Sequence, residues 1–280
     1  MIIKGSAPAE SHGITIMSDN DVYTSSMLFR IRGDIVATAE DAHGEVTVID
    51  NKVYRLLSFD RVFEQSKMQK SNPMIPVHKY ICAMLMATAL TPANRILVLG
   101  LGGGCLIRPL FAGNPQIVID AVELRQVVLD VALAHFHLPV TPDIHYRVED
   151  AADFMAQADP ARYSLIFSDL YSASAIVPLQ SSREFLRQCA QTLQPNGWLV
   201  LNHPQAPDED SAFSDALTTL FRTVLYCTTP SGNVVIYASV GHCSTPLTQL
   251  RAMMKASGEG YQSDFSLLAH KIYRWPGQQT

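Results

Sequence analysis

The chain of 280 residues has few of the features that mark disulfide-rich, metal-binding or membrane proteins. Its five cysteines are odd in number, lie far apart and never form a CxxC pair, which argues against a disulfide framework and against a zinc site. The longest apolar run, at 80–90, is well short of the roughly 20 residues that span a bilayer, and no signal peptide is visible. We therefore expect no metal, no membrane segment and a cytoplasmic location.

Charged residues are also sparse, at 17% of the chain, and the net charge is −5. Without an excess of basic residues the protein lacks the field that holds a nucleic-acid backbone, so nucleic acid is not expected as a partner. Apolar residues make up 48%, which is typical of a globular protein with a large core. The length suits a main domain with a smaller one beside it.

The pattern of apolar residues divides the chain near residue 72. Before this point, residues 44–50 alternate apolar and polar side chains, and 52–59 follow after a turn, which predicts a small antiparallel sheet. After it, the apolar stretch at 80–90 predicts a buried helix. We expect an N-terminal β-hairpin domain at 1–72 and a second, larger domain at 73–280.

From residue 95 onward, short apolar runs of strand length alternate with stretches of helical length, such as 127–136 and 182–193. This alternation is typical of βαβ units and predicts an α/β fold with a Rossmann-like parallel sheet. The predicted strands are 95–100, 117–123, 144–148, 163–169 and 198–202, followed by an antiparallel pair at 223–228 and 234–239.

The first of these strands ends in the glycine-rich sequence GLGGG at 100–104. Glycine lets the backbone turn tightly and approach a ligand closely, and the next helix offers its N-terminal N–H groups. A dinucleotide fingerprint requires its third glycine at the position of Cys105, so Gly100, Gly102 and Gly104 favour a ligand without a pyrophosphate, such as an adenosyl sulfonium. A plain strand-to-helix turn is the alternative.

Three carboxylates follow the next three strands, at the edge where ligands bind in such sheets. Glu123 lies 21 residues after Gly102, where an acidic residue accepts ribose hydroxyls in nucleotide-binding folds. Asp150 can accept the adenine amino group or cap the following helix, two roles that are compatible. Asp169 faces the reacting centre, where a carboxylate can hold or deprotonate a nucleophile. A solvated side chain at a strand end is the alternative for Glu123 and Asp169.

In their order and spacing these segments resemble the spermidine synthase (polyamine aminopropyltransferase) family and its divergent bacterial members. The resemblance covers 44–239 and rests on ILVLGLGGG, AVEL, VEDAADF, YSLIFSDLY, REFL…LQPNGWLVLN and TTPSG. It implies the S-adenosylmethionine-dependent methyltransferase fold and a homodimer. It also implies transfer of an aminopropyl group from decarboxylated S-adenosylmethionine to a small amine, with release of methylthioadenosine.

The resemblance also assigns roles to individual residues. Gln65, which nothing in its spacing marks, matches a glutamine that contacts the nucleoside, Glu123 matches the ribose ligand and Asp150 the adenine ligand. Asp169 matches the catalytic carboxylate that holds or deprotonates the amine. The expected acceptor pocket is lined by Tyr171, His78 and Tyr80.

The chain departs from the family on the acceptor side. Gly103 and Ser172 stand where the family has aspartates, and Thr229 stands where it has the tyrosine of the amine pocket. Two lost charge-assisted contacts weaken polyamine binding by on the order of 1.5–3 kcal/mol each, so putrescine is not the expected acceptor. Without a carboxylate at position 103, the carboxylate of intact S-adenosylmethionine is no longer repelled, and the glycine-rich N–H groups can accept it.

Two alternatives to an aminopropyltransferase therefore stay open. One is a methyltransferase on the same scaffold, which Gly103 favours, although the prolines of amino-methylating motifs are absent after Asp169. The other is a nucleoside-binding protein that has lost its chemistry, which the altered acceptor side favours.

Overall fold

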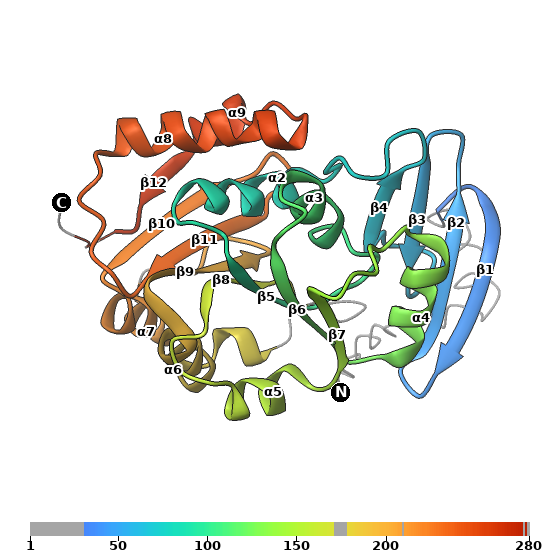
Figure 1. Cartoon of the computed structure of the whole chain (residues 1–280), viewed down its shortest axis with the longest axis horizontal. Helices are drawn as coiled ribbons and strands as arrows, with labels where there is room; N and C mark the ends of the chain where they lie inside the picture. The colour runs from blue at the N-terminus through green and yellow to red at the C-terminus, as the bar shows by residue number, and fades with distance from the viewer. Residues whose placement is uncertain (1–30, 171–177, 209, 277, 279–280) are drawn as a thin grey trace, which may run out of the picture.

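The computed structural model describes residues 31–170, 178–208, 210–276 and 278, and its strands form two sheets (Figure 1). The smaller sheet is antiparallel, with the order β1-β2-β3-β4. Its strands are β1 (Asp34–Asp41), β2 (Gly44–Asp50), β3 (Tyr54–Ser58) and β4 (Ser66–Gln69). The turn between β2 and β3 forms because the Asn51 side chain accepts the N–H groups of Val53 and Tyr54, at 2.9 and 2.7 Å. The predicted antiparallel sheet before residue 72 is thus confirmed.

The larger sheet has the order β12-β10-β11-β9-β8-β5-β6-β7. Its strands are β5 (Arg95–Leu99), β6 (Val118–Glu123), β7 (Ile144–Val148), β8 (Tyr163–Ser168), β9 (Leu193–His203), β10 (Thr223–Thr228), β11 (Val234–Ser239) and β12 (Ile272–Arg274). The strands from β7 to β9 are parallel, and β11, β10 and β12 join in antiparallel pairs. The chain returns from β7 to the far side of β5, so a topological switch point lies between β5 and β8, where ligands bind in such folds. The α/β fold class is confirmed.

Helices cover both faces of this sheet, as Figure 1 shows. One face is covered by α2 (Lys79–Leu85), η1 (Met86–Ala89), α3 (Ile107–Gly113), α8 (Leu247–Ala256), η3 (Ser257–Tyr261) and α9 (Ser266–Ala269). The other face is covered by α5 (Ala151–Gln157), η2 (Pro178–Ser181), α6 (Arg183–Thr192) and α7 (Ala212–Leu220). The predicted helix at 182–193 is α6, which begins after Ser182 because its Oγ accepts the N–H of Phe185 at 3.2 Å. Among the described helices, none combines the length and the hydrophobicity of a transmembrane span.

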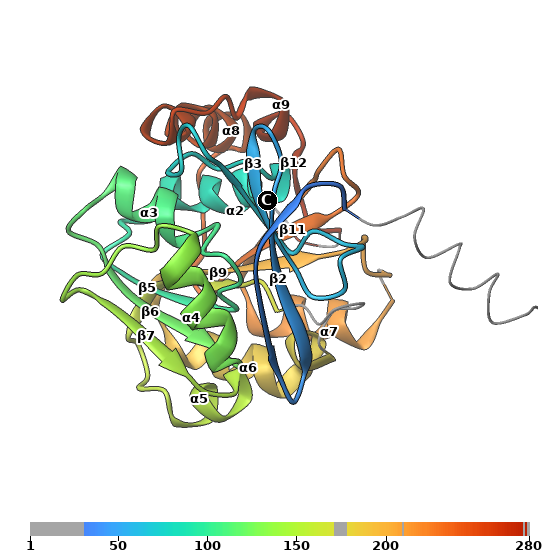
Figure 2. The ribbon, with the colours of Figure 1, turned by 90° about the vertical axis from the view of Figure 1, so that its right-hand side faces the viewer.

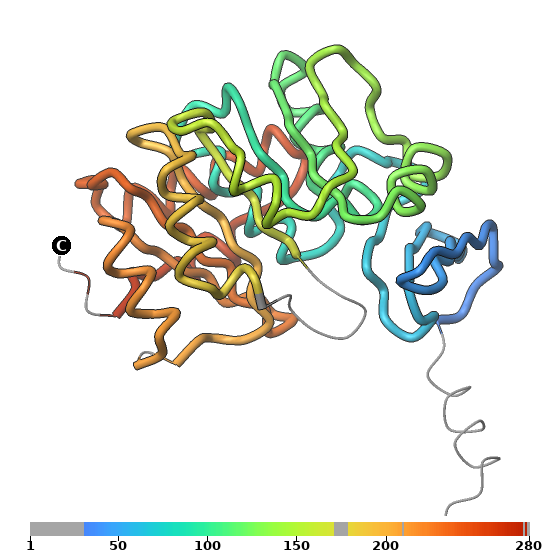
Figure 3. Tube along the Cα trace, turned by 90° about the horizontal axis from the view of Figure 1, so that it is seen from below, coloured from blue at the N-terminus to red at the C-terminus, as the bar shows by residue number. Residues whose placement is uncertain are grey.

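One helix, α4 (Gln126–His135), packs against both sheets. Its Leu129 and Ala132 belong to the core of the large sheet, whereas Val128 and Val131 join Phe136 in the core of the small one. Figure 2, in which the small sheet faces the viewer, shows α4 beside the β1–β2 hairpin. Figure 3 shows the small sheet at the opposite end of the molecule from the C-terminus. The two sheets therefore share packing through α4.

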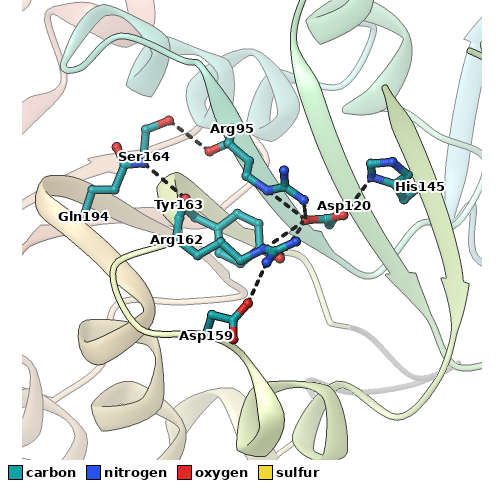
Figure 4. Close-up of polar contacts among 8 residues, drawn as sticks. All are labelled: Arg95, Asp120, His145, Asp159, Arg162, Tyr163, Ser164 and Gln194. Carbon is teal, nitrogen blue, oxygen red and sulfur yellow. Dashed lines mark hydrogen bonds and ion pairs between the residues drawn. The ribbon is translucent and has the colours of Figure 1, made fainter. Parts of the chain in front are cut away.

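A cluster of charged side chains joins the amino ends of four parallel-sheet strands (Figure 4). Asp120 of β6 is 1% exposed and accepts hydrogen bonds from Tyr163 Oη (2.8 Å) and Arg95 Nη2 (2.8 Å), and it contacts His145 Nδ1 at 2.9 Å. Arg162 Nε lies 3.7 Å from the same carboxylate. Because the amino ends of the strands lie at the edge opposite the switch point, we assign the cluster a structural role, in which it links the four strands to one another.

Candidate functional site

The strand register brings four predicted site residues together at the carboxyl edge of the large sheet. Leu99 pairs with Val122 on one side and with Ser168 on the other, and Glu123 pairs with Val148. The edge therefore presents, in order, Asp150, Glu123, Gly100 and Asp169. With adjacent strands about 4.8 Å apart, this row is roughly 14 Å long, which suits an extended adenosyl compound.

The glycines of the loop after β5 are required by the protein's own packing. Gly100, Gly102 and Gly104 have φ values of 88°, 50° and 72°, in the region that favours glycine. A Cβ on Gly100 would come within 2.4 Å of the Asp169 carbonyl oxygen, and one on Gly104 within 2.1 Å of Leu138 Cδ2. Close approach between β5 and β8 therefore needs Gly100, whatever else binds there.

Gly103 is packed beneath the small sheet. Its N–H donates to Ser66 Oγ at 2.8 Å. A Cβ at this position would lie 2.9 Å from Ser66 Cβ and 3.0 Å from Phe136 Cδ1. The structure therefore has no room for a side chain here, because Ser66 of β4 and Phe136 fill the space.

Arg108, at the start of α3, anchors the same loop. Its guanidinium is 1% exposed and donates to the carbonyl oxygens of Pro73 (2.8 Å), Phe136 (3.1 Å) and Gly103. Burial lowers the pKa of this guanidinium. Because three carbonyl groups accept from it, Arg108 holds the loop, the end of α4 and the segment before α2 in fixed positions.

Glu123 ends β6 with its carboxylate directed at the glycine loop. Oε2 accepts the N–H groups of Leu101 (3.1 Å) and Gly102 (3.4 Å), and Oε1 accepts the N–H of Arg125 (3.0 Å). Burial raises the pKa of this carboxyl, and the three backbone hydrogen bonds oppose the rise. The group is thus a fixed acceptor beside the loop.

Asp150 caps the N-terminus of α5, which is one of the two roles predicted for it. Its Oδ1 accepts the N–H of Ala152 at 2.7 Å, and the residue is exposed at the carboxyl end of β7. The cap fixes the position of the carboxylate on the row.

Asp169 and Tyr80, predicted from different parts of the sequence, meet in the structure. The Asp169 carboxylate accepts from Asn202 Nδ2 at 2.8 Å and is hydrogen-bonded to the Tyr80 side chain. Burial raises the pKa of Asp169 to about 6, and these two hydrogen bonds limit the rise. A carboxylate with this pKa is ionised near neutral pH and accepts a proton more readily than an exposed aspartate.

Sequence reasoning missed a network of amides behind Asp169. Asn202 Oδ1 accepts from Asn233 Nδ2 at 3.1 Å, and the Asn202 carbonyl accepts from Gln180 Nε2 at 2.9 Å. Ser168 Oγ donates to Gln180 Oε1 at 2.9 Å. The available signal was an asparagine ending the apolar strand WLVLN, in the same position as the carboxylates of the other strands.

His78 lies between Tyr80 and the start of β4. Its ring centroid is 5.4 Å from that of Tyr80, and its Nδ1 is 4.0 Å from Glu64 Oε1, which also pairs with Lys67 at 2.6 Å. His78 Nε2 is buried and has no hydrogen-bond partner among the described residues. Burial lowers the pKa of His78, so the imidazole is neutral at pH 7.

Two further residues were predicted for the site, Gln65 and Tyr171. Gln65 immediately precedes Ser66, which contacts the glycine loop, and its own N–H donates to the Leu57 carbonyl at 2.8 Å. Tyr171 lies outside the described residues. No group of three or more potential metal ligands occurs among the residues that the structure describes.

Comparison with known proteins gives sequence relatives of two kinds. No protein-family model matches the chain. A polyamine aminopropyltransferase of Chromobacterium violaceum is 29% identical over 228 residues, which are 80% of this chain and 86% of that protein. An eEF1A lysine and N-terminal methyltransferase homolog of Drosophila melanogaster is 28% identical over 181 residues, 60% of this chain but only 26% of that protein.

Solved structures support the fold. A probable spermidine synthase from Corynebacterium glutamicum superposes with a TM-score of 0.70 at 20% identity, covering 88% of this chain and 96% of that one. Human methyltransferase-like protein 13, solved in complex with SAH, gives a TM-score of 0.58 at 23% identity, covering 67% and 94%. Both similarities show a shared fold.

Proposed function

Since the chain is a divergent relative of the polyamine aminopropyltransferases, we propose that it is a transferase that moves an aminopropyl or related alkyl group to an amine other than putrescine. The donor is S-adenosylmethionine or its decarboxylated form. The observation that supports this most is the row of groups at the carboxyl edge, with half-buried carboxylates at Glu123 and Asp169 on either side of the glycine loop.

Glu123 and Asp150 form the nucleoside half of the proposed site. Glu123 accepts the ribose hydroxyls, and its three backbone donors keep the carboxylate oriented before the ligand arrives. Asp150 accepts the adenine amino group from its position at the end of β7. Gln65 contacts the nucleoside from the small sheet. A preformed arrangement of this kind reduces the entropy lost on binding.

Asp169 is the catalytic residue of the acceptor half. The neutral amine attacks the carbon bonded to the sulfonium, the N–C bond forms, and the C–S bond breaks with its electron pair going to sulfur. The thioether nucleoside leaves, and the extra proton on nitrogen passes to the Asp169 carboxylate. A pKa of about 6 suits this transfer, because the carboxylate is ionised at neutral pH yet basic enough to take the proton.

The described hydrogen-bond partners of Asp169 indicate the kind of acceptor. They are the hydroxyl of Tyr80, the amide of Asn202 and, beyond Asn202, the amide of Asn233. Amides and hydroxyls hydrogen-bond a neutral polar group, whereas a second ammonium needs a second carboxylate to offset its desolvation. We therefore propose a monoamine with a polar, uncharged body. Tyr80 and His78 line its pocket.

Calorimetry on two matched variants tests the nucleoside site. The protein is expected to bind methylthioadenosine, and Glu123→Gln weakens that binding roughly 10- to 100-fold, because hydrogen bonds to a charged acceptor contribute about 1.5–3 kcal/mol. Glu149→Gln, which alters a carboxylate two residues before α5, is the control and keeps the affinity of the parent. Equal affinities for the parent and Glu123→Gln would contradict the proposal, as would no binding of any adenosyl compound by the folded parent.

Methyl transfer is the second candidate, and Gly103 is the observation that favours it. Since Ser66 and Phe136 fill the space beside Gly103, the loop cannot carry the carboxylate that the family uses to hold the aminopropyl ammonium. Intact S-adenosylmethionine brings its own carboxylate, which the loop N–H groups can accept. Product analysis separates the two reactions, because S-adenosylhomocysteine forms only in methyl transfer and methylthioadenosine in aminopropyl transfer.

The proposal extends to the assembly and location of the protein. We infer a cytoplasmic homodimer, as expected for a protein that resembles the polyamine enzymes. Light scattering on the purified chain measures the mass directly, and a monomer at micromolar concentration would contradict the dimer.

A further inference from the structure

The turn between β1 and β2 makes an ion pair that reaches the loop after β6. Arg125 donates to both carboxylate oxygens of Asp41, from Nη2 at 2.7 Å and from Nε at 3.0 Å, and Nη2 also donates to the Gly44 carbonyl at 2.6 Å. The guanidinium lies 4.9 Å from the centre of the Phe59 ring. Arg125 is 8% exposed, and its hydrogen bonds hold the pKa of Asp41 below the usual value. The small sheet thus holds the Arg125 guanidinium in place through the Asp41 side chain and the Gly44 backbone carbonyl.

The backbone of Arg125 acts on the nucleoside side of the same loop. Its N–H donates to Glu123 Oε1 at 3.0 Å, and its carbonyl accepts the N–H groups of Val128 and Leu129 at the start of α4. The other two donors to Glu123 come from the glycine loop. Arg125 therefore connects the hairpin, the first turn of α4 and the Glu123 carboxylate.

From this geometry we propose that Arg125 is a positioning residue, and that the Asp41–Arg125 pair lets the small sheet set the orientation of Glu123 and the glycine loop. The planar guanidinium fork fixes the direction of approach to a carboxylate, which a lysine ammonium does not. The main chain at 123–125 is then held from the hairpin side as well as by β6. Neither Asp41 nor the Arg125 side chain needs to contact the ligand.

Amide hydrogen exchange tests this positioning in the absence of any ligand. Asp41→Asn removes the charge of the pair but keeps a hydrogen-bond acceptor, so the protein is expected to stay folded. The N–H groups of Leu101 and Gly102, which donate to Glu123, should then exchange about tenfold faster than in the parent, because their acceptor is less well fixed. Unchanged exchange at these two amides in Asp41→Asn would overturn the inference.

The same hairpin offers a matched control. Glu45 of β2 pairs with Arg61 through two bonds of 2.6 Å, and this ion pair does not reach the loop after β6. Glu45→Gln therefore removes a comparable bidentate pair from the small sheet. It should leave the exchange of Leu101 and Gly102 within about twofold of the parent. Equal acceleration by both variants would mean that the small sheet is loosened as a whole, and would also overturn the specific role of Arg125.

Affinity for methylthioadenosine tests the consequence for function, and this step rests on the proposed nucleoside site. Asp41→Asn and Arg125→Lys should each weaken binding about 3- to 10-fold, and the double variant should be no weaker than the worse single one, because both remove one interaction. Additive losses would refute the pairing. If exchange accelerates but the parent binds no adenosyl compound, the positioning role stands and the proposed function fails.

Discussion

Replacing Asp120 by asparagine is the sharpest test of what holds the large sheet together. The variant keeps the size of the side chain but removes the negative charge that Arg95, Tyr163 and His145 share. The affected strands are β5, β6, β7 and β8, at the ends opposite the proposed site. The change should therefore lower stability and leave catalysis alone.

The magnitude follows from the exposure of the partners. Removing one member of a buried ion pair costs about 3–5 kcal/mol, because the other charge is left without compensation. Asp120 is fully buried, but the side chains of Arg95 and Arg162 are 29% and 33% exposed, so water screens the guanidinium groups that remain. We therefore expect a loss of about 2–3 kcal/mol in the free energy of unfolding. For a chain of this size that is a fall of roughly 5–10 °C in Tm.

Urea unfolding at several pH values checks both the size and the cause. Burial raises the pKa of Asp120, but the hydrogen bonds from Tyr163 and Arg95 outweigh it, so the folded pKa lies below 3.8. The stability that the carboxylate provides is present above the unfolded pKa and is lost as pH falls through the folded one. The difference between parent and variant should be full at pH 5–8 and shrink below about pH 4.

Asp159→Asn is the matched control for this experiment. Asp159 also pairs with Arg162, at 2.6 Å, but its side chain is 71% exposed, so its loss should change stability by less than about 1 kcal/mol. Equal stability of the parent and Asp120→Asn at pH 7 would refute the reasoning. So would a difference that persists unchanged at pH 3.

Three further predictions concern the site. Asp169→Asn should lower kcat about 10²- to 10⁴-fold with little change in adenosyl affinity, measured by turnover and calorimetry; equal loss of both would contradict a base role. The pKa of Asp169 is raised from its usual value to about 6, so its charge destabilises the ligand-free protein as pH rises from about 4 to about 6. Asp169→Asn should therefore be more stable than the parent by about 3 kcal/mol at pH 8 but not at pH 4. Gly103→Asp should destabilise the protein by about 1–3 kcal/mol through overpacking against Ser66, and it should not create a preference for decarboxylated S-adenosylmethionine; a thermally unchanged variant would mean that β4 moves aside easily.

The parts of the fold that sequence could predict are those where apolar residues run together. Strands β5 to β8 and the pair β10 and β11 agree with the predicted runs to within a residue or two, because each is a short run bounded by turns and all but β7 are largely buried. Strand β1 was missed because its side chains are mostly exposed, so DIVATAED shows no alternation. Strand β12 was missed because three residues are too few to show a period.

The residues of the candidate site also fall into those that a local sequence pattern predicts and those that only the fold brings together. Glu123, Asp150 and Asp169 were predictable because each follows an apolar strand, and parallel pairing brings such residues to one edge. The contact of Asn202 with Asn233 depends on the antiparallel register of β9 and β11, which no local pattern encodes. The ion pair between Asp41 and Arg125 joins residues 84 apart, so only the folded chain reveals it.

The core shared by the small sheet and α4 also has a consequence for how the protein emerges from the ribosome. Strands β1 to β4 are synthesised first, but Val46, Val48, Leu57 and Met68 are covered only when 128–136 has been translated. Until then the nascent sheet exposes one apolar face. A ribosome-bound chain halted where β4 has cleared the exit tunnel but 128–136 has not should therefore be sensitive to protease and recruit chaperones, whereas one halted far enough beyond 136 for α4 to clear the tunnel should not.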